Sequence, residues 1–238
     1  RDRNVLFNAQ ESVKQLQAGL ALDWKTAAGT VKSSLYYSNR DFIGLLPFTN
    51  GGYVELNRGF AGLEMSLNNS FNEFEWTLGA SVQSQADDRK RFDNNEGVKG
   101  EMAMDQLESF DSYGMFALGS LNKPKYSLQA GVRFDVHQIS MNDNFGLDQQ
   151  YVDYSSRLSA YSPNIGFIYN LNKRDELYAN YGSSYETPSL SELSANPDGS
   201  GFNNQLSPMV SNGFDLGYRK STRSFSYSFT AVSYTHLR

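Results

Sequence analysis

Residues 126–137 are the most regular segment of this chain, and their alternation restricts its possible folds more than any other feature. Apolar side chains occupy one set of alternate positions: Tyr126, Leu128, Ala130, Val132, Phe134 and Val136. The other set contains Gln129, Arg133, Asp135 and His137, together with a serine and a glycine. A period of two places these sets on opposite faces of a β-strand. A strand of this length, apolar on one face only, is typical of a membrane crossing in a β-barrel.

Similar alternation recurs along the chain and predicts about ten antiparallel strands. The expected strands cover residues 12–23, 30–41, 59–68, 74–83, 106–121, 126–137, 157–170, 177–184, 212–220 and 224 onward. Short turns near residues 26, 71, 123, 173 and 221 alternate with longer polar loops at residues 46–58, 85–104, 140–156 and 187–209. Short connections on one rim and long ones on the other are typical of an outer-membrane barrel. Residues 1–11 are predicted to be a loop end, and only residues 98–107 could form a turn or two of helix.

Composition excludes several classes of protein. The net charge of -5 and the mixing of acidic with basic residues give no basic surface for nucleic acid. There is no cysteine, which excludes disulfide scaffolds and thiolate metal sites. The sequence contains no run of eighteen apolar residues, so no transmembrane helix is predicted. The mean hydropathy of -0.54 is compatible with a barrel, because its apolar and polar faces average out. The chain begins at Arg1 without a signal peptide and ends on YTHLR in mid-strand, so we expect an internal fragment with a truncated or spliced end.

No catalytic or metal-binding constellation is predicted, and no cofactor. The two histidines, His137 and His236, are far apart and lack ligand spacing, so His137 is interpreted as a polar residue facing a lumen. The acidic residues near position 90 alternate with arginine and lysine, which favours a solvated loop over a calcium site. Four aromatic residues lie just after short turns and suggest a girdle at the membrane interface: Trp76, Tyr126, Tyr178 and Phe225.

Several segments resemble the late barrel of a TonB-dependent outer-membrane receptor. The run SPNIGFIYNLNKRDELYANYGSSYETPSLSELSANPDGS is followed by SNGFDLGYR, and both are similar to family segments. The family's aromatic-x-x-Pro-x-x-x-Glu-Leu pattern corresponds here to Tyr185, Pro188, Glu192 and Leu193. Met209 stands where the family usually has glutamate, and Asp215 replaces another glutamate. The sequence therefore indicates the family more clearly than the subfamily. Upstream, YYSNRDFIGLLPFTNGG and LNRGFAGLE resemble the siderophore-receptor branch.

The resemblance implies an all-β fold in which residues 1–238 are part of a 22-stranded barrel, with the plug domain and the TonB-contacting box outside this sequence. It also implies a bacterial outer-membrane location, import of a scarce nutrient such as a ferric siderophore, and partners comprising outer-membrane lipid, the TonB complex and a metal-chelate ligand. Two alternatives stay open at this point: a passive porin, and a soluble or surface-displayed all-β binding module.

Three expectations concern geometry. The alternate positions Gln129, Arg133, Asp135 and His137 should face the lumen, while the intervening apolar residues face lipid. The long loops should share one rim, with candidates for ligand contact at Tyr185, Asn196, Asp198, Phe202 and Asn203. Ten strands cut from a wide barrel should form an open curved sheet, because strand number, tilt and shear together set the curvature of the wall.

Overall fold

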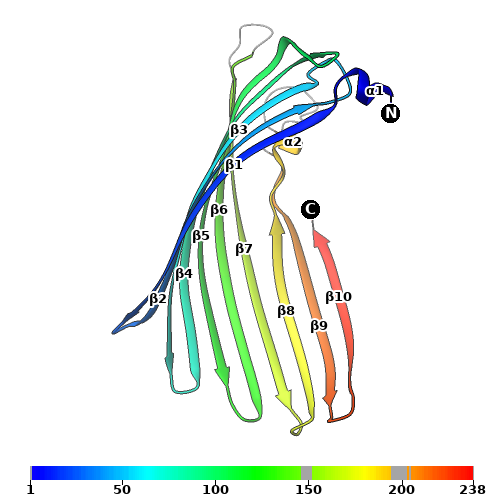
Figure 1. The fold of residues 1–238 in the computed structure, drawn as a ribbon. Coiled ribbons are helices and arrows are strands. Elements are labelled where there is room, and N and C mark those ends of the chain that lie inside the picture. Colours follow the sequence, from blue (N-terminus) through cyan, green and yellow to red (C-terminus); the bar gives the residue numbers. More distant parts are fainter. Residues whose placement is uncertain (1, 146–151, 194–202, 204, 238) are drawn as a thin grey trace.

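The computed structural model describes residues 2–145, 152–193, 203 and 205–237, and within them it forms one open antiparallel sheet of ten strands (Figure 1). Each strand pairs with its neighbours in sequence, and no pairing joins the first strand to the last among these residues. The prediction of an open sheet with separated end strands is therefore confirmed. The elements are α1 (Asp2–Leu6), β1 (Gln10–Thr26), β2 (Gly29–Leu45), β3 (Tyr53–Phe71), β4 (Phe74–Asn95), β5 (Val98–Asn122), β6 (Tyr126–Asp143), β7 (Val152–Asn170), β8 (Asp175–Glu186), α2 (Leu190–Leu193), β9 (Met209–Ser221) and β10 (Ser226–Leu237).

The short turns gather at one end of the sheet and the longer connections at the other (Figure 1). Asn72 takes a positive φ of 54° in the turn between β3 and β4, a conformation that asparagine tolerates better than most residues. Lys123 in the turn before β6 donates to Glu73 of that neighbouring turn, and this hydrogen bond raises the pKa of the lysine ammonium. The predicted division of turns and loops between two rims is correct.

One face of the sheet is apolar and exposed across many strands, and we call it the apolar face. Hydrogen-bonded pairing aligns a row of six such residues on it: Leu20, Leu35, Leu63, Val82, Tyr113 and Val136. The first five members of this row are 39–55% exposed. Apolar area of this extent is unfavourable against water, so this face requires an apolar cover.

The opposite face, which we call the polar face, carries Gln129, Arg133, Asp135 and His137 on β6. One aromatic of the predicted girdle also lies there. Tyr178 pairs with Gly217, and its hydroxyl is 2.5 Å from the Thr230 hydroxyl of β10 on the same face. The girdle assignment is therefore wrong for Tyr178, because this residue alternates with the apolar residues of β8 and faces away from them.

The largest error of the sequence prediction is the segment 85–104, expected to be a loop. It is instead the end of β4 and the start of β5, joined at Glu96 and Gly97, whose φ angles are 54° and 93°. Two successive positive φ angles are typical of a type I′ hairpin turn. Charged side chains form ion pairs along this extension: Arg89 of β4 pairs with Glu108 of β5, and Lys99 of β5 pairs with Glu55 of β3. Apolar alternation ends here, but backbone pairing does not depend on it.

Other strands also extend into segments that were expected to be loops. Residues 98–107 belong to strand β5 and not to a helix, and the expected loop 46–58 shrinks because β3 begins at Tyr53. β6 extends to Asp143 and β7 begins at Val152, which shortens the expected loop 140–156. Residues 2–6, expected to be a loop, form the helix α1. Among the described residues, no helix is long and apolar enough to span a membrane.

Candidate functional site

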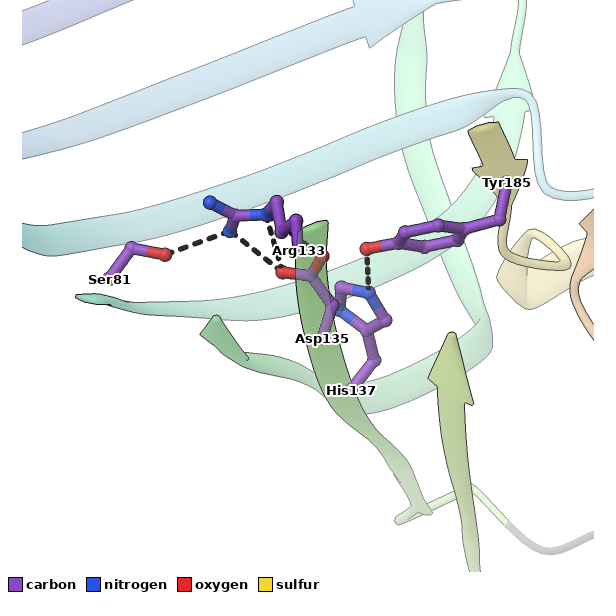
Figure 2. Close-up of polar contacts among 5 residues, drawn as sticks. All are labelled: Ser81, Arg133, Asp135, His137 and Tyr185. Carbon is purple, nitrogen blue, oxygen red and sulfur yellow. Dashed lines mark hydrogen bonds and ion pairs between the residues drawn. The ribbon is translucent and has the colours of Figure 1, made fainter. Parts of the chain in front are cut away.

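An ion pair on the polar face forms the centre of the candidate site (Figure 2). The Arg133 guanidinium donates to the Asp135 carboxylate through Nε and Nη2, at distances of 2.7–2.9 Å. Its Nη2 also donates to the Ser81 hydroxyl at 2.9 Å, which connects β6 to β4 across the intervening strand. Asp135 is 1% exposed, so its charge depends on this arginine.

Gly114 of β5 creates the space in which this pair lies. Register places it between Ser81 on β4 and Asp135 on β6. A Cβ atom at this position would lie 2.6 Å from the Asp135 Oδ1 and 2.7 Å from the Ser81 hydroxyl. Any larger residue would therefore push apart the three side chains that the glycine lets meet.

His137 continues the cluster along β6 towards the rim of the long connections. Its Nε2 lies 2.7 Å from the Tyr185 hydroxyl, and either group can donate in this hydrogen bond (Figure 2). The Phe110 ring stacks against the imidazole with 5.3 Å between ring centroids. His137 is 7% exposed, and its Nδ1 is buried without a hydrogen-bond partner in the described part of the chain. The imidazole is thus held between a strand of the wall and the end of β8.

Beyond His137 the polar face becomes apolar. Ile139, Met141 and Leu158 form a buried patch on β6 and β7, and Leu193 of α2 packs into it with no exposed surface. Leu190 and Leu206 pack at the border of this patch. The described beginning of the connection after β8, residues 187–193, therefore folds against the polar face.

A capping box shapes the short helix α2. The Glu192 carboxylate accepts from the Ser189 backbone N–H at 2.8 Å, and the Ser189 hydroxyl accepts from the Glu192 N–H at 3.3 Å. This reciprocal arrangement satisfies backbone donors at the start of a helix. Leu190 and Leu193 lie three residues apart, so a helical turn directs both to the same side.

A second charged group lies beside this segment. Arg58 donates to both oxygens of Asp87 at 2.8 Å and 2.6 Å, and Arg89 pairs with Glu108 at 3.1 Å. A pocket of about 290 Å³ separates these pairs from residues 187–190. Each arginine is already neutralised by a carboxylate, so the pocket has paired charges and no net positive field.

The structure brings together only some of the predicted site residues. Arg133, Asp135 and His137 form one cluster, whereas Gln129 lies nearer the short turns and is exposed. Tyr185 joins the cluster through His137, and the Asn203 N–H donates to the Leu193 carbonyl at 2.7 Å. Asn196, Asp198 and Phe202 lie outside the described residues. No group of three or more His, Cys, Asp or Glu residues suited to a metal ion occurs in the described ranges.

Sequence reasoning missed Ser81, Gly114, Phe110 and the role of Leu193. The first three meet Arg133, Asp135 and His137 only through the register between strands. No local pattern identifies such partners. The SLSE sequence at residues 189–192 is a detectable capping signal, and it could have predicted the helix that carries Leu193.

Long antiparallel strands, an exposed apolar face and an opposite polar face define a portion of a transmembrane β-barrel wall. Comparison with known families refines this class: the family described as "TonB dependent receptor-like, beta-barrel" matches residues 2–237. The chain therefore belongs to the TonB-dependent receptor family, whose barrels lie in the bacterial outer membrane.

Solved structures with the same fold include two transporters and a siderophore receptor. The ferric citrate transporter FecA in its unliganded form is 14% identical with a TM-score of 0.74, over 96% of this chain and 35% of FecA. The siderophore receptor PiuA from Acinetobacter baumannii is 12% identical with a TM-score of 0.69, over 95% of this chain and 40% of PiuA. The copper transporter OprC is 15% identical with a TM-score of 0.75, over 94% of this chain and 39% of OprC. The chain thus spans well under half the length of these proteins, and the likeness shows the fold.

Proposed function

We propose that this chain is a barrel section of an outer-membrane receptor that binds a scarce nutrient and imports it with energy from the TonB complex. The ligand we favour is a ferric siderophore. The observation that carries the proposal is the family match over residues 2–237. We infer that TonB contacts a region outside this sequence, and that the protein acts as a transporter and not as an enzyme.

The two faces support this proposal. We propose that the polar face, with Gln129, Arg133, Asp135 and His137, lines the barrel lumen and that the apolar face contacts outer-membrane lipid. A soluble all-β module would lack the apolar band that the described strands expose. A small closed porin would pair the first strand with the last, and β1 and β10 do not pair within the described residues. Both observations favour a section of a wide barrel.

We propose that the connection between β8 and β9 contributes to the ligand site, with Asn196, Asp198, Phe202 and Asn203 as candidate contacts and Tyr185 at its base. Amide, carboxyl and aromatic side chains suit a polar metal chelate. The partly buried pocket between residues 187–190 and the two arginine pairs adjoins this connection. Copper is a second candidate cargo, because the copper transporter OprC shares the fold at a TM-score of 0.75.

The test is uptake by the intact receptor in an outer-membrane host that lacks its own iron-chelate receptors. Radiolabelled iron is supplied as citrate, catecholate and hydroxamate complexes, and radiolabelled copper(II) is supplied separately. We expect saturable uptake of at least one iron complex that stops when TonB is deleted. Saturable uptake of copper alone would indicate that the cargo is copper and not a ferric siderophore. Non-saturable entry that does not depend on TonB would contradict the proposal and favour a passive porin.

A further inference from the structure

Strands β7 and β8 are paired along only part of their length. Their ladder runs only from Asn170↔Glu176 to Asn164↔Gly182, whereas β7 stays paired with β6 as far as Val152. β8 meanwhile stays paired with β9 as far as Glu186. Pro163 follows the last pair on the β7 side and has no backbone N–H to continue a ladder. The ends of β8 and β9 therefore leave the wall as a pair.

This separation changes the face on which Tyr185 lies. If the ladder continued in register beyond Asn164↔Gly182, Tyr185 would stand opposite Tyr161. Tyr161 belongs to the apolar face, where it is 66% exposed and contacts the Phe134 ring at 4.6 Å between centroids. The Tyr185 hydroxyl instead meets the His137 imidazole on the polar face at 2.7 Å. The two positions of Tyr185 exclude each other, because a side chain in a regular ladder cannot reach both faces.

A second attachment follows a few residues later. Leu193 is fully buried against Ile139, Met141 and Leu158, which belong to β6 and β7. Residues 187–192 are thus held at both ends, by a hydrogen bond before them and by an apolar contact after them. The Leu193 carbonyl also accepts from the Asn203 N–H, so a candidate ligand residue is fixed to the same anchor.

We propose that Tyr185 and His137 are positioning residues: their hydrogen bond keeps β8 separated from β7 and holds residues 187–193 against the inner wall of the barrel. This inference rests on the proposed function, since the segment it positions leads to Asn203. Tyr185 acts through His137 and the backbone of this segment, because its hydroxyl is hydrogen-bonded to the imidazole. The Phe110 ring stacks on the imidazole from the strand side.

Cross-linking in the intact receptor tests the geometry without any ligand. This chain has no cysteine, so paired cysteines can be introduced after any in the rest of the receptor are replaced. Ser162→Cys with Ser184→Cys reports a continued ladder and leaves Tyr185 and His137 in place, and Phe167→Cys with Ala179→Cys is the positive control in the part of the ladder that is paired. With a short bifunctional thiol reagent in isolated outer membranes, we expect a cross-link in the control pair and little between positions 162 and 184, and Tyr185→Phe should increase the latter. Efficient cross-linking of positions 162 and 184 while Tyr185 and His137 are intact would overturn the proposal.

Uptake kinetics test the positioning role. For each chelate that the wild-type receptor imports, Tyr185→Phe should raise KM about three- to tenfold, the effect of one ordinary hydrogen bond. Vmax and the amount of folded receptor should not change. His137→Ala should act similarly, and His137→Gln should recover most of the loss because its amide can bond the tyrosine. Tyr161→Phe, on the other face, is the matched control.

The outcomes separate the two proposals. An unchanged KM in Tyr185→Phe would overturn the positioning role even if positions 162 and 184 do not cross-link. An equal loss of Vmax and of folded receptor would do the same, because it would indicate a purely structural contact. If the wild-type receptor imports none of the chelates, the proposed function fails, while the cross-linking result still decides whether β8 is anchored.

Discussion

Replacing Val132 by arginine should be costly because it places a charge near the middle of the bilayer. The apolar positions of β6 run from Tyr126 to Val136, and ten steps of about 3.4 Å give roughly 34 Å along the strand. A tilt of about 40° reduces this to roughly 26 Å across the membrane, close to the apolar band of outer-membrane barrels. Val132 lies a little beyond half of that depth and is 46% exposed. Arginine at the midplane of a lipid-facing position costs about 2–4 kcal/mol.

A cost of this size reduces the folding equilibrium constant by about thirty- to a thousandfold. The assay is denaturant titration of the intact receptor folded into lipid vesicles, with the folded fraction read by its electrophoretic shift. Gln129→Arg is the matched control, because it introduces the same side chain on the polar face of the same strand. We expect a much smaller loss there. Equal losses at Val132 and Gln129 would refute the assignment of the two faces.

Three further predictions follow from the site. Gly114→Ala should lower stability by about 1–3 kcal/mol through overpacking, whereas Gly59→Ala, with only one distant neighbour for its Cβ, should cost less than 1 kcal/mol in the same titration. Leu193→Ala should destabilise the attachment of residues 187–193 by about 2–5 kcal/mol, read as faster amide hydrogen exchange confined to that segment, and unchanged exchange would contradict the packing. Deleting residues 194–205 should abolish chelate binding while the barrel still folds; unaltered binding would remove this connection from the ligand site.

Alternation predicted the strands well where one face is apolar and exposed, and poorly elsewhere. Along β6 the apolar and polar positions lie on opposite faces as expected from Tyr126 to His137. In β4 and β5 the ladder continues past residue 84 among charged residues, because backbone pairing persists where both faces are polar. The apolar signal reports the environment of the side chains, so it ends before the strand does.

The candidate site shows a different limit. Arg133, Asp135 and His137 share a face by periodicity, so their grouping was predictable from sequence. Their partners Ser81 and Gly114 come from other strands, and only the register brings them within reach. Tyr185 stays a predicted ligand contact, and its side chain reaches β6 only because β8 leaves the ladder at Gly182. That departure depends on a tertiary contact between distant residues.

The most direct test of the account is an accessibility scan of residues 126–137 in the intact receptor embedded in lipid vesicles. A nitroxide label is placed at each position in turn, and its collision rates with dissolved oxygen and with a water-soluble nickel complex are measured. We predict that oxygen collisions dominate at the apolar positions, including Leu128, Ala130 and Val132. Nickel collisions should be relatively higher at Gln129, Arg133 and the other alternate positions, giving a period of two. A uniform profile along the strand, or the reverse phase, would contradict the assignment of one face to lipid and the other to the lumen.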